Sequence, residues 1–159
     1  MQVKDVMTRN IVTVRRSTTL SELIGLFQRH NFHTIPVIAE DKTLIGVVNF
    51  ENLLKVFQPY GTEISQLLRP VPLLLLDDDV EEDIVLSEIS SDIGKLLLVD
   101  DLMETNFVSV TDEDSIHHTR SLMRMQKIKQ IPVVKEGKLV GIISLFDIII
   151  NVFKDKGVI

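Results

Sequence analysis

The sequence predicts a mixed α/β (α+β) fold in which two copies of a β-α-β-β-α unit pack sheet to sheet about a pseudo-twofold axis. The first observation behind this prediction is an internal repeat, which decides the whole architecture. The second is that the hydrophobic period changes in the same order within each copy. The matching segments are 3–7 and 99–103, 10–14 and 106–110, and 35–37 and 131–133, each 96 residues apart, and 44–48 and 139–143, which are 95 residues apart.

The first copy opens with a short strand and continues into an amphipathic helix. Thr19 and Glu22 have the spacing of a capping box, and apolar residues follow at three- and four-residue intervals from Leu20 to Phe27. Two short apolar runs on either side of residues 40–42 predict a hairpin. The expected elements are a strand at 11–14, a helix at 20–30, hairpin strands at 35–38 and 44–48, and a helix at 50–57.

The second copy repeats this order with a less regular first helix. We expect Asp114 to begin that helix, with apolar positions from Ile116 to Met125. Hairpin strands are expected at 131–134 and 139–143, and a final helix at 145–153. The resulting organisation is a first repeat at 1–57, an acidic connector at 58–98 and a second repeat at 99–159.

Each unit is too small to bury its sheet alone. A unit of about 55 residues with three short strands leaves one apolar sheet face that its own two helices do not cover. Packing the two sheets together would bury Val12, Val14, Val37 and Val47 with their counterparts in the second copy. The clefts that remain between the repeats are places where a ligand could sit.

The charge of the chain is concentrated in one segment. The net charge is −6, yet residues 77–101 contain ten acids and one base, so the remainder carries +3. The chain lacks the basic stripe with interleaved aromatics that is typical of nucleic-acid binders. It also lacks cysteine and any apolar run near the roughly 18 residues that span a bilayer. We therefore expect no direct contact with nucleic acid or membrane, and a cytoplasmic location.

Three motifs together resemble the CBS domain, a family named after cystathionine β-synthase whose tandem form is the Bateman module. They are the Met-x-x-Asn-x-Val-Thr/Ser-Val openings, the Ile-Pro-Val strands, and a closing segment at 141–148 that is similar to the family's Gly-x-Val/Ile-Ser/Thr-x-x-Asp-Ile/Leu signature. The resemblance implies a non-enzymatic regulatory module without a cofactor. It also implies an adenine-containing ligand, AMP, ADP, ATP or S-adenosylmethionine, in the clefts between the repeats, and signalling in trans to an effector protein.

Ser144 and Asp147 are the central candidates for this ligand. Ser144 is expected at the N-cap of the final helix and Asp147 at its third position, where a hydroxyl, backbone N–H groups and the positive end of the helix dipole converge. A phosphate would suit this place, and the carboxylate could accept hydrogen bonds from a ribose diol. The alternative is an ordinary capping box, because Ser-x-x-Asp also begins helices that bind nothing.

The resemblance also implies the lining of this nucleotide-binding cleft. By position, the adenine pocket would be formed by the opening segment of the opposite repeat, and phosphate contacts would come from basic residues just before the proline-containing strands, His33 and Lys129. Core packing is the alternative role for the apolar lining residues, and solvation is the alternative for the basic ones. The expected lining residues are Thr8, Asn10, Ile11, Val12 and Phe32.

The first copy departs from the signature. Asn49 and Asn52 replace the serine and the aspartate, so the first copy lacks the charge that would strengthen a hydrogen bond to a diol by about 1 kcal/mol. We therefore expect a second, weaker cleft. Its lining would comprise Asn49, Asn52, His33, Asn106, Phe107, Val108 and Ile128.

Two further functions compete with ligand sensing. Catalysis has no supporting motif, and the histidine pairs at 30 and 33 and at 117 and 118 lack the carboxylates that would complete a metal site, so no metal is expected. The stronger competitor is a ligand-free assembly scaffold. The helices at 50–57 and 145–153 are apolar on more than one face, which predicts a homodimer in which equivalent helices meet. The connector is the candidate surface for a specific partner.

Overall fold

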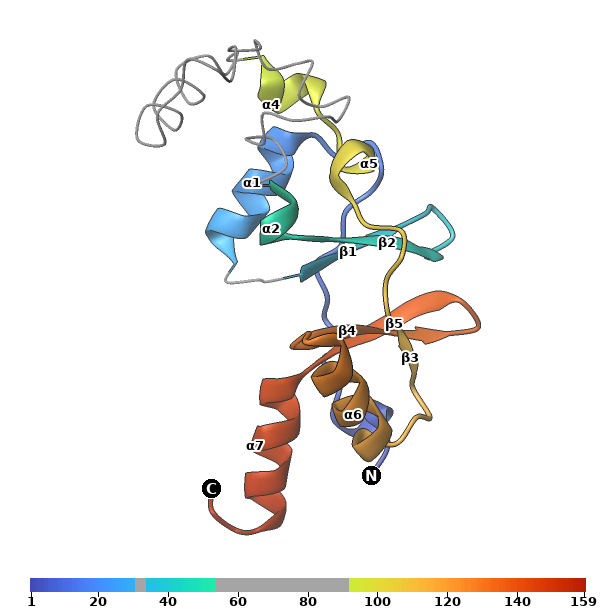
Figure 1. Ribbon diagram of the computed structural model, residues 1–159, viewed down its shortest axis with the longest axis vertical. Helices are drawn as coiled ribbons and strands as arrows, with labels where there is room; N and C mark the ends of the chain where they lie inside the picture. The colour runs from blue at the N-terminus through green and yellow to red at the C-terminus, as the bar shows by residue number, and fades with distance from the viewer. Residues whose placement is uncertain (31–33, 54–91) are drawn as a thin grey trace, which may run out of the picture. The chain divides into compact units, whose positions relative to one another are not determined.

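The computed structural model describes residues 1–30, 34–53 and 92–159, and these residues belong to two compact units (Figure 1). Unit 1 comprises Met1–Thr13, Pro36–Val47 and Thr105–Ile159, and unit 2 comprises Val14–Ile35 and Val48–Glu104. Each unit therefore draws on both sequence repeats. The mixed α/β class predicted from the sequence is confirmed.

Unit 1 contains a three-stranded sheet in the order β3-β4-β5, where β3 is parallel to β4 and β4 is antiparallel to β5. The turn between β4 and β5 places Glu136 and Gly137 at positive φ, as a tight hairpin requires. Helices α6 and α7 pack against each other, and α7 also packs on β5. The elements are η1 (Val3–Asp5), β3 (Val110–Thr111), α6 (Ile116–Gln126), β4 (Gln130–Lys135), β5 (Lys138–Ser144) and α7 (Leu145–Asp155).

The opening segment of the first repeat is part of the core of unit 1. Val3, Val6 and Met7 pack with core residues of β3, α6, β4, β5 and α7. Thr8 then forms a reciprocal pair of 2.9 Å backbone hydrogen bonds with Ile142 on β5. Residues 1–8 are thus fixed beside the strand that leads into α7.

Unit 2 contains the α-helices of the first repeat together with the helices that lead into the second. Its elements are α1 (Leu20–Arg29), α2 (Phe50–Leu53), α4 (Ile93–Leu96) and α5 (Val99–Leu102), and α1 packs against α4. Leu20 N–H donates to the Leu97 carbonyl at 2.8 Å, so the segment just before the second repeat is bonded to the start of α1. The capping box predicted at Thr19 is confirmed, since its hydroxyl accepts from Glu22 N–H at 3.2 Å.

The hairpin of the first repeat contributes to both units. It consists of β1 (Thr34–Ile38) and β2 (Leu44–Asn49), close to the predicted strands. Val37 and Val47 are buried as expected, and Val14 is buried in unit 2. Val12 is only half-buried, so its predicted place in the core is wrong.

Several predicted boundaries were wrong. No strand covers 11–14 among the described residues, and the opening strand of the second copy shrinks to β3, because these segments lack a continuous ladder partner. Ser115, not Asp114, caps α6: its hydroxyl accepts from His118 N–H, whereas Asp114 accepts from Thr111 N–H. The helix predicted at 50–57 is described only as α2, and its remainder and most of the connector lie outside the described residues. No described helix is long and apolar enough to cross a membrane.

Candidate functional site

The start of α7 is closed by a complete capping box. Ser144 Oγ accepts from Asp147 N–H at 3.0 Å and donates to Asp147 Oδ2 at 2.6 Å. Ser144 N–H also donates to Asp147 Oδ2, at 2.8 Å. Both side chains are half-buried. One carboxylate oxygen of Asp147 is therefore fully engaged in holding the helix start.

This arrangement corrects the expectation of free donors at the helix start. The N–H groups of Ser144 and Asp147 donate within the box, and Leu145 N–H donates to the Lys129 carbonyl at 2.8 Å. The Ser144 hydroxyl already donates to Asp147, so it has no proton left for a phosphate. What the site offers instead is an acceptor, because Asp147 Oδ1 has no hydrogen-bond partner among residues 1–30, 34–53 and 92–159.

A second unused acceptor belongs to Gln130. Gln130 and Ser144 are directly opposed on β4 and β5, so their side chains lie on the same face of the sheet. Gln130 Oε1 is buried and has no hydrogen-bond partner in the described part of the chain. A buried unpaired carbonyl of this kind costs about 1–3 kcal/mol and calls for a donor. Sequence reasoning missed Gln130, although it lies directly between Lys129 and the Ile-Pro-Val motif.

The predicted lining of this site is brought together in part. Thr8 is held by its two bonds to Ile142, two residues before Ser144. Asn10 is exposed, and Ile11 and Val12 are half-buried, all within unit 1. Phe32 and His33 lie outside the described residues. The part of the site that can be described thus combines the opening of the first repeat with the closing motif of the second.

The corresponding place in the first repeat has a different set of contacts. Asn52 is 2% exposed, and its Oδ1 accepts from Asn49 N–H at 2.7 Å, so the amide performs the capping that Asp147 performs in the second repeat. Its Nδ2 donates to Glu104 Oε1 at 2.9 Å. The expectation that this place lacks a carboxylate is therefore wrong. Glu104 was missed, although it stands 96 residues after Thr8 and so occupies the equivalent position in the repeat.

Asn106, Phe107, Val108 and Ile128, also predicted for the second cleft, lie in unit 1, whereas Asn49 and Asn52 lie in unit 2. His33 lies outside the described residues. Val108 and Ile128 pack against the core of unit 1, which is the alternative role considered for apolar lining residues. Asn106 is exposed and Phe107 is half-buried. Among the described residues, no three His, Asp or Glu side chains are grouped as a metal site would require.

Comparison with known proteins gives a consistent family assignment. A sequence model of the CBS domain matches residues 3–59 and 99–154. Protein MJ1404 of Methanocaldococcus jannaschii is 26% identical over 185 residues, and the alignment covers 97% of this chain and 44% of that protein. The CBS domain-containing protein YhcV of Bacillus subtilis is 26% identical over 149 residues, which cover 94% of this chain and 84% of YhcV. The chain thus spans less than half of the first relative and most of the second.

Solved structures agree with this assignment. The crystal structure of CBSX2 in complex with AMP is 25% identical, has a TM-score of 0.70 and covers 98% of both chains. The CBS domain pair of protein MJ0100, solved with 5-methylthioadenosine and S-adenosyl-L-methionine, has a TM-score of 0.65 at 18% identity and covers 98% of both chains. The second similarity, at this level of identity, concerns the fold alone.

Proposed function

The chain belongs to the CBS domain family and carries two copies of the domain, and from this premise we propose that it is a regulatory module that binds an adenine-containing ligand beside the start of α7. The candidate ligands are AMP, ADP, ATP and S-adenosylmethionine. The observation that carries the proposal is the pair of unused acceptors, Asp147 Oδ1 and Gln130 Oε1. A ligand that donates two or more hydrogen bonds completes both.

A nucleoside provides the required donors. The two hydroxyls of a ribose can donate to Asp147 Oδ1, which retains its lone pairs because the capping bonds all go to Oδ2. Hydrogen bonds to a charged acceptor contribute about 1.5–3 kcal/mol, enough to favour a diol over a deoxy sugar by tenfold or more. The complex of CBSX2 with AMP supports an adenylate as the ligand class.

Asp147→Asn is the sharpest test of this site. Asn52 performs the same capping in the first repeat, so an amide at position 147 can keep the start of α7 while removing the charged acceptor. We expect wild-type protein to bind AMP in calorimetry and the variant to bind it about tenfold more weakly or worse. Asp155→Asn, which removes an exposed charge at the end of α7, is the control and should bind AMP like wild type.

The Asn52 site is proposed as the weaker of the two. Both polar ends of the Asn52 amide are already engaged, by Asn49 N–H and by Glu104, so ligand binding there must compete with existing bonds. Glu104 is the available carboxylate, and it is exposed, where water competes for the same hydrogen bonds. Calorimetry should resolve one strong site rather than two equal ones.

The assembly function remains as a second proposal, and the surface of α7 favours it. Phe146, Ile149 and Phe153 are 68%, 41% and 44% exposed at spacings of three and four residues, so they form one apolar stripe. We propose that this stripe meets the same stripe of a second copy in a homodimer. Light scattering of Ile149→Asp with Phe153→Asp should then give a monomer, and an unchanged mass would exclude this face.

Signalling would follow from differential binding. A ligand shifts the population of conformations only by as much as its affinity differs between them, and an effector protein in trans would recognise the favoured one. A ligand at a hundredfold excess over its dissociation constant should add about 2.7 kcal/mol to the free energy of unfolding. A scaffold without a ligand would show no such gain with any of the four candidates.

A further inference from the structure

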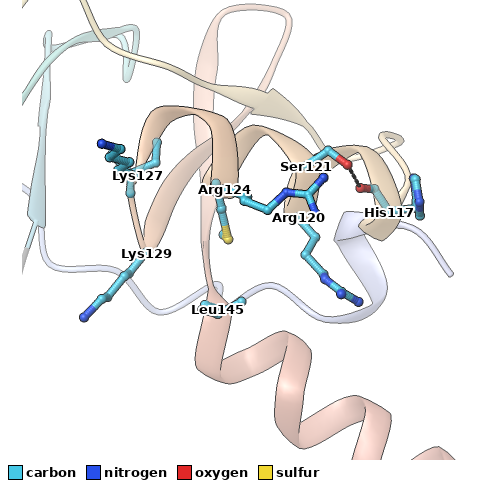
Figure 2. A pocket seen from close by; sticks show the side chains of 9 residues that line it. His117, Arg120, Ser121, Arg124, Lys127, Lys129 and Leu145 are labelled. Carbon is cyan, nitrogen blue, oxygen red and sulfur yellow. Dashed lines mark hydrogen bonds between the residues drawn. The ribbon is translucent and has the colours of Figure 1, made fainter.

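A cavity of about 550 Å³ lies along α6 and the beginning of α7 (Figure 2). In Figure 2 the labelled side chains run along α6 from His117, near its start, to Lys127, just past its end, and Leu145 lies at the beginning of α7. The volume falls within the range of about 300–1,000 Å³ that is usual for small-molecule sites. Its lining comprises His117, Arg120, Ser121, Met123, Arg124, Lys127, Ile128, Lys129 and Leu145.

The charge of this lining is entirely positive. Arg120, Arg124, Lys127 and Lys129 contribute four cations, and no acidic residue lines the cavity. Throughout residues 1–30, 34–53 and 92–159, none of the four forms an ion pair with an acid. Like charges that share one cavity repel each other, so an anion bound there would relieve the repulsion and gain charge-assisted hydrogen bonds.

The helix dipole does not account for this cluster. It favours cations in the last turn of α6, which suits Arg124 and Lys127. Arg120, however, lies in the N-terminal half of the helix, where the dipole does not favour a cation. Lys127 also adopts the left-handed conformation, with φ of 55°, a place where glycine is usual and where another residue costs about 1–2 kcal/mol.

The four cations are exposed, and the remaining lining includes apolar side chains. Met123 is buried and Ile128 and Leu145 are half-buried, so one side of the cavity is apolar. Electrostatic attraction is stronger where apolar side chains limit the access of water. We propose that this cavity is an anion-binding site for a polyphosphate group, formed mainly by Arg120 and Arg124 of α6.

The polyphosphate has two possible sources. It could be a free polyphosphate, or the phosphate chain of a nucleotide whose nucleoside contacts Asp147. The second source is favoured by two contacts: Leu145 lines the cavity directly after Ser144, and the Lys129 carbonyl accepts from Leu145 N–H. The N–H groups of Ser144, Leu145 and Asp147 at the start of α7 are already engaged, so phosphates would find most of their donors on α6 instead. In that case the inference rests on the proposed function, whereas binding of free polyphosphate does not.

The experiment uses the full chain and three probes in calorimetry: inorganic tripolyphosphate, adenosine and ATP. Arg120→Gln with Arg124→Gln should weaken tripolyphosphate binding by about tenfold per arginine. The double variant should leave adenosine binding unchanged. Lys154→Gln with Lys156→Gln removes the same charge from the far end of α7 and should bind tripolyphosphate like wild type.

The outcomes separate the inference from the proposed function. If Arg120→Gln with Arg124→Gln also weakens ATP binding, the bound phosphates are those of the nucleotide. If ATP binding is unchanged while tripolyphosphate binding is lost, the ligand is a free polyphosphate. Both results support the site. Equal losses of tripolyphosphate affinity in the two double variants would show that only the net charge matters, and would overturn the anion site on α6. Failure of wild type to bind tripolyphosphate would also overturn it. Failure of adenosine alone would count only against the proposed function.

Discussion

Asn52 donates a 2.9 Å hydrogen bond to Glu104, and this contact joins the closing motif of the first repeat to the opening segment of the second. The counterparts of these two positions in the other repeat are Asp147, in the closing motif of the second repeat, and Thr8, in the opening segment of the first. The carboxylate of each pair therefore sits on a different member. In the pair 52/104 it belongs to Glu104 of the opening segment, and in the pair 147/8 it belongs to Asp147 of the helix. This exchange is the physical basis of the inequality that we propose between the two sites.

The contact between Asn52 and Glu104 can be tested by replacing Asn52. Asn52→Asp places a second carboxylate against Glu104 and removes the bond between them, which should lower the free energy of unfolding by about 1–3 kcal/mol at neutral pH. Repulsion raises the pKa of one carboxyl above its value in the unfolded chain, so the variant should be less impaired in acid and lose stability as pH rises through that raised pKa. Urea unfolding over a series of pH values measures this.

The matched control completes the exchange. Asn52→Asp combined with Glu104→Thr gives positions 52 and 104 the residue types of Asp147 and Thr8. The double variant should recover most of the lost stability and should lose the pH dependence of the single variant. If the single and double variants were equally stable, the contact between residues 52 and 104 would not govern this part of the fold.

The second prediction concerns the attachment of the opening segment to β5. A Cβ added at Gly141 would lie 2.6 Å from Met7 Sδ and 3.1 Å from the Thr8 carbonyl oxygen. Gly141→Ala must therefore displace the buried Met7 side chain and crowd the Thr8 backbone, which should cost about 1–3 kcal/mol. Gly25→Ala is the same substitution in the middle of α1, where the nearest atom is 3.6 Å away. It should stabilise by about 0.5–1 kcal/mol. A Gly141→Ala variant with wild-type stability would contradict the close packing of residues 7 and 8 on β5.

The third prediction separates stability from binding at Gln130. Gln130→Leu removes the buried unpaired oxygen, so the ligand-free protein should unfold at the same temperature as wild type or a higher one. The same variant should bind adenosine more weakly, because the ligand loses an acceptor. Gln126→Leu, at the exposed end of α6, should change stability by no more than about 0.5 kcal/mol and leave binding intact. Loss of stability together with loss of binding in Gln130→Leu would indicate a purely structural residue.

Much of this architecture could be predicted because it depends on local patterns. The Thr19–Glu22 and Ser144–Asp147 boxes are determined by residues three apart. The first box was predicted from this spacing, and the second was the alternative to a ligand role for Ser144 and Asp147. The repeat also predicted the positions of both hairpins. The opening segments were harder, since residues 10–14 form no continuous ladder, a property that depends on partners distant in the sequence.

The missed site residues share a similar cause. Glu104 acquires its role only through a contact 52 residues away along the chain, although its equivalence to Thr8 was visible in the repeat. Gln130 was indistinguishable from any polar residue at a strand start until its oxygen proved to be buried. Arg120 and Arg124 were not singled out in the sequence, because the cavity beside them depends on how α6 packs on α7.

Calorimetry with AMP on wild type and Asp147→Asn is the decisive test of whether Asp147 Oδ1 accepts hydrogen bonds from the ribose of an adenylate. We expect a single strong site in wild type, weakened by about tenfold or more in the variant, while the melting temperature of the variant without ligand stays close to that of wild type. Equal affinity in the two proteins, or no binding of AMP, ADP, ATP or S-adenosylmethionine by wild type, would contradict it.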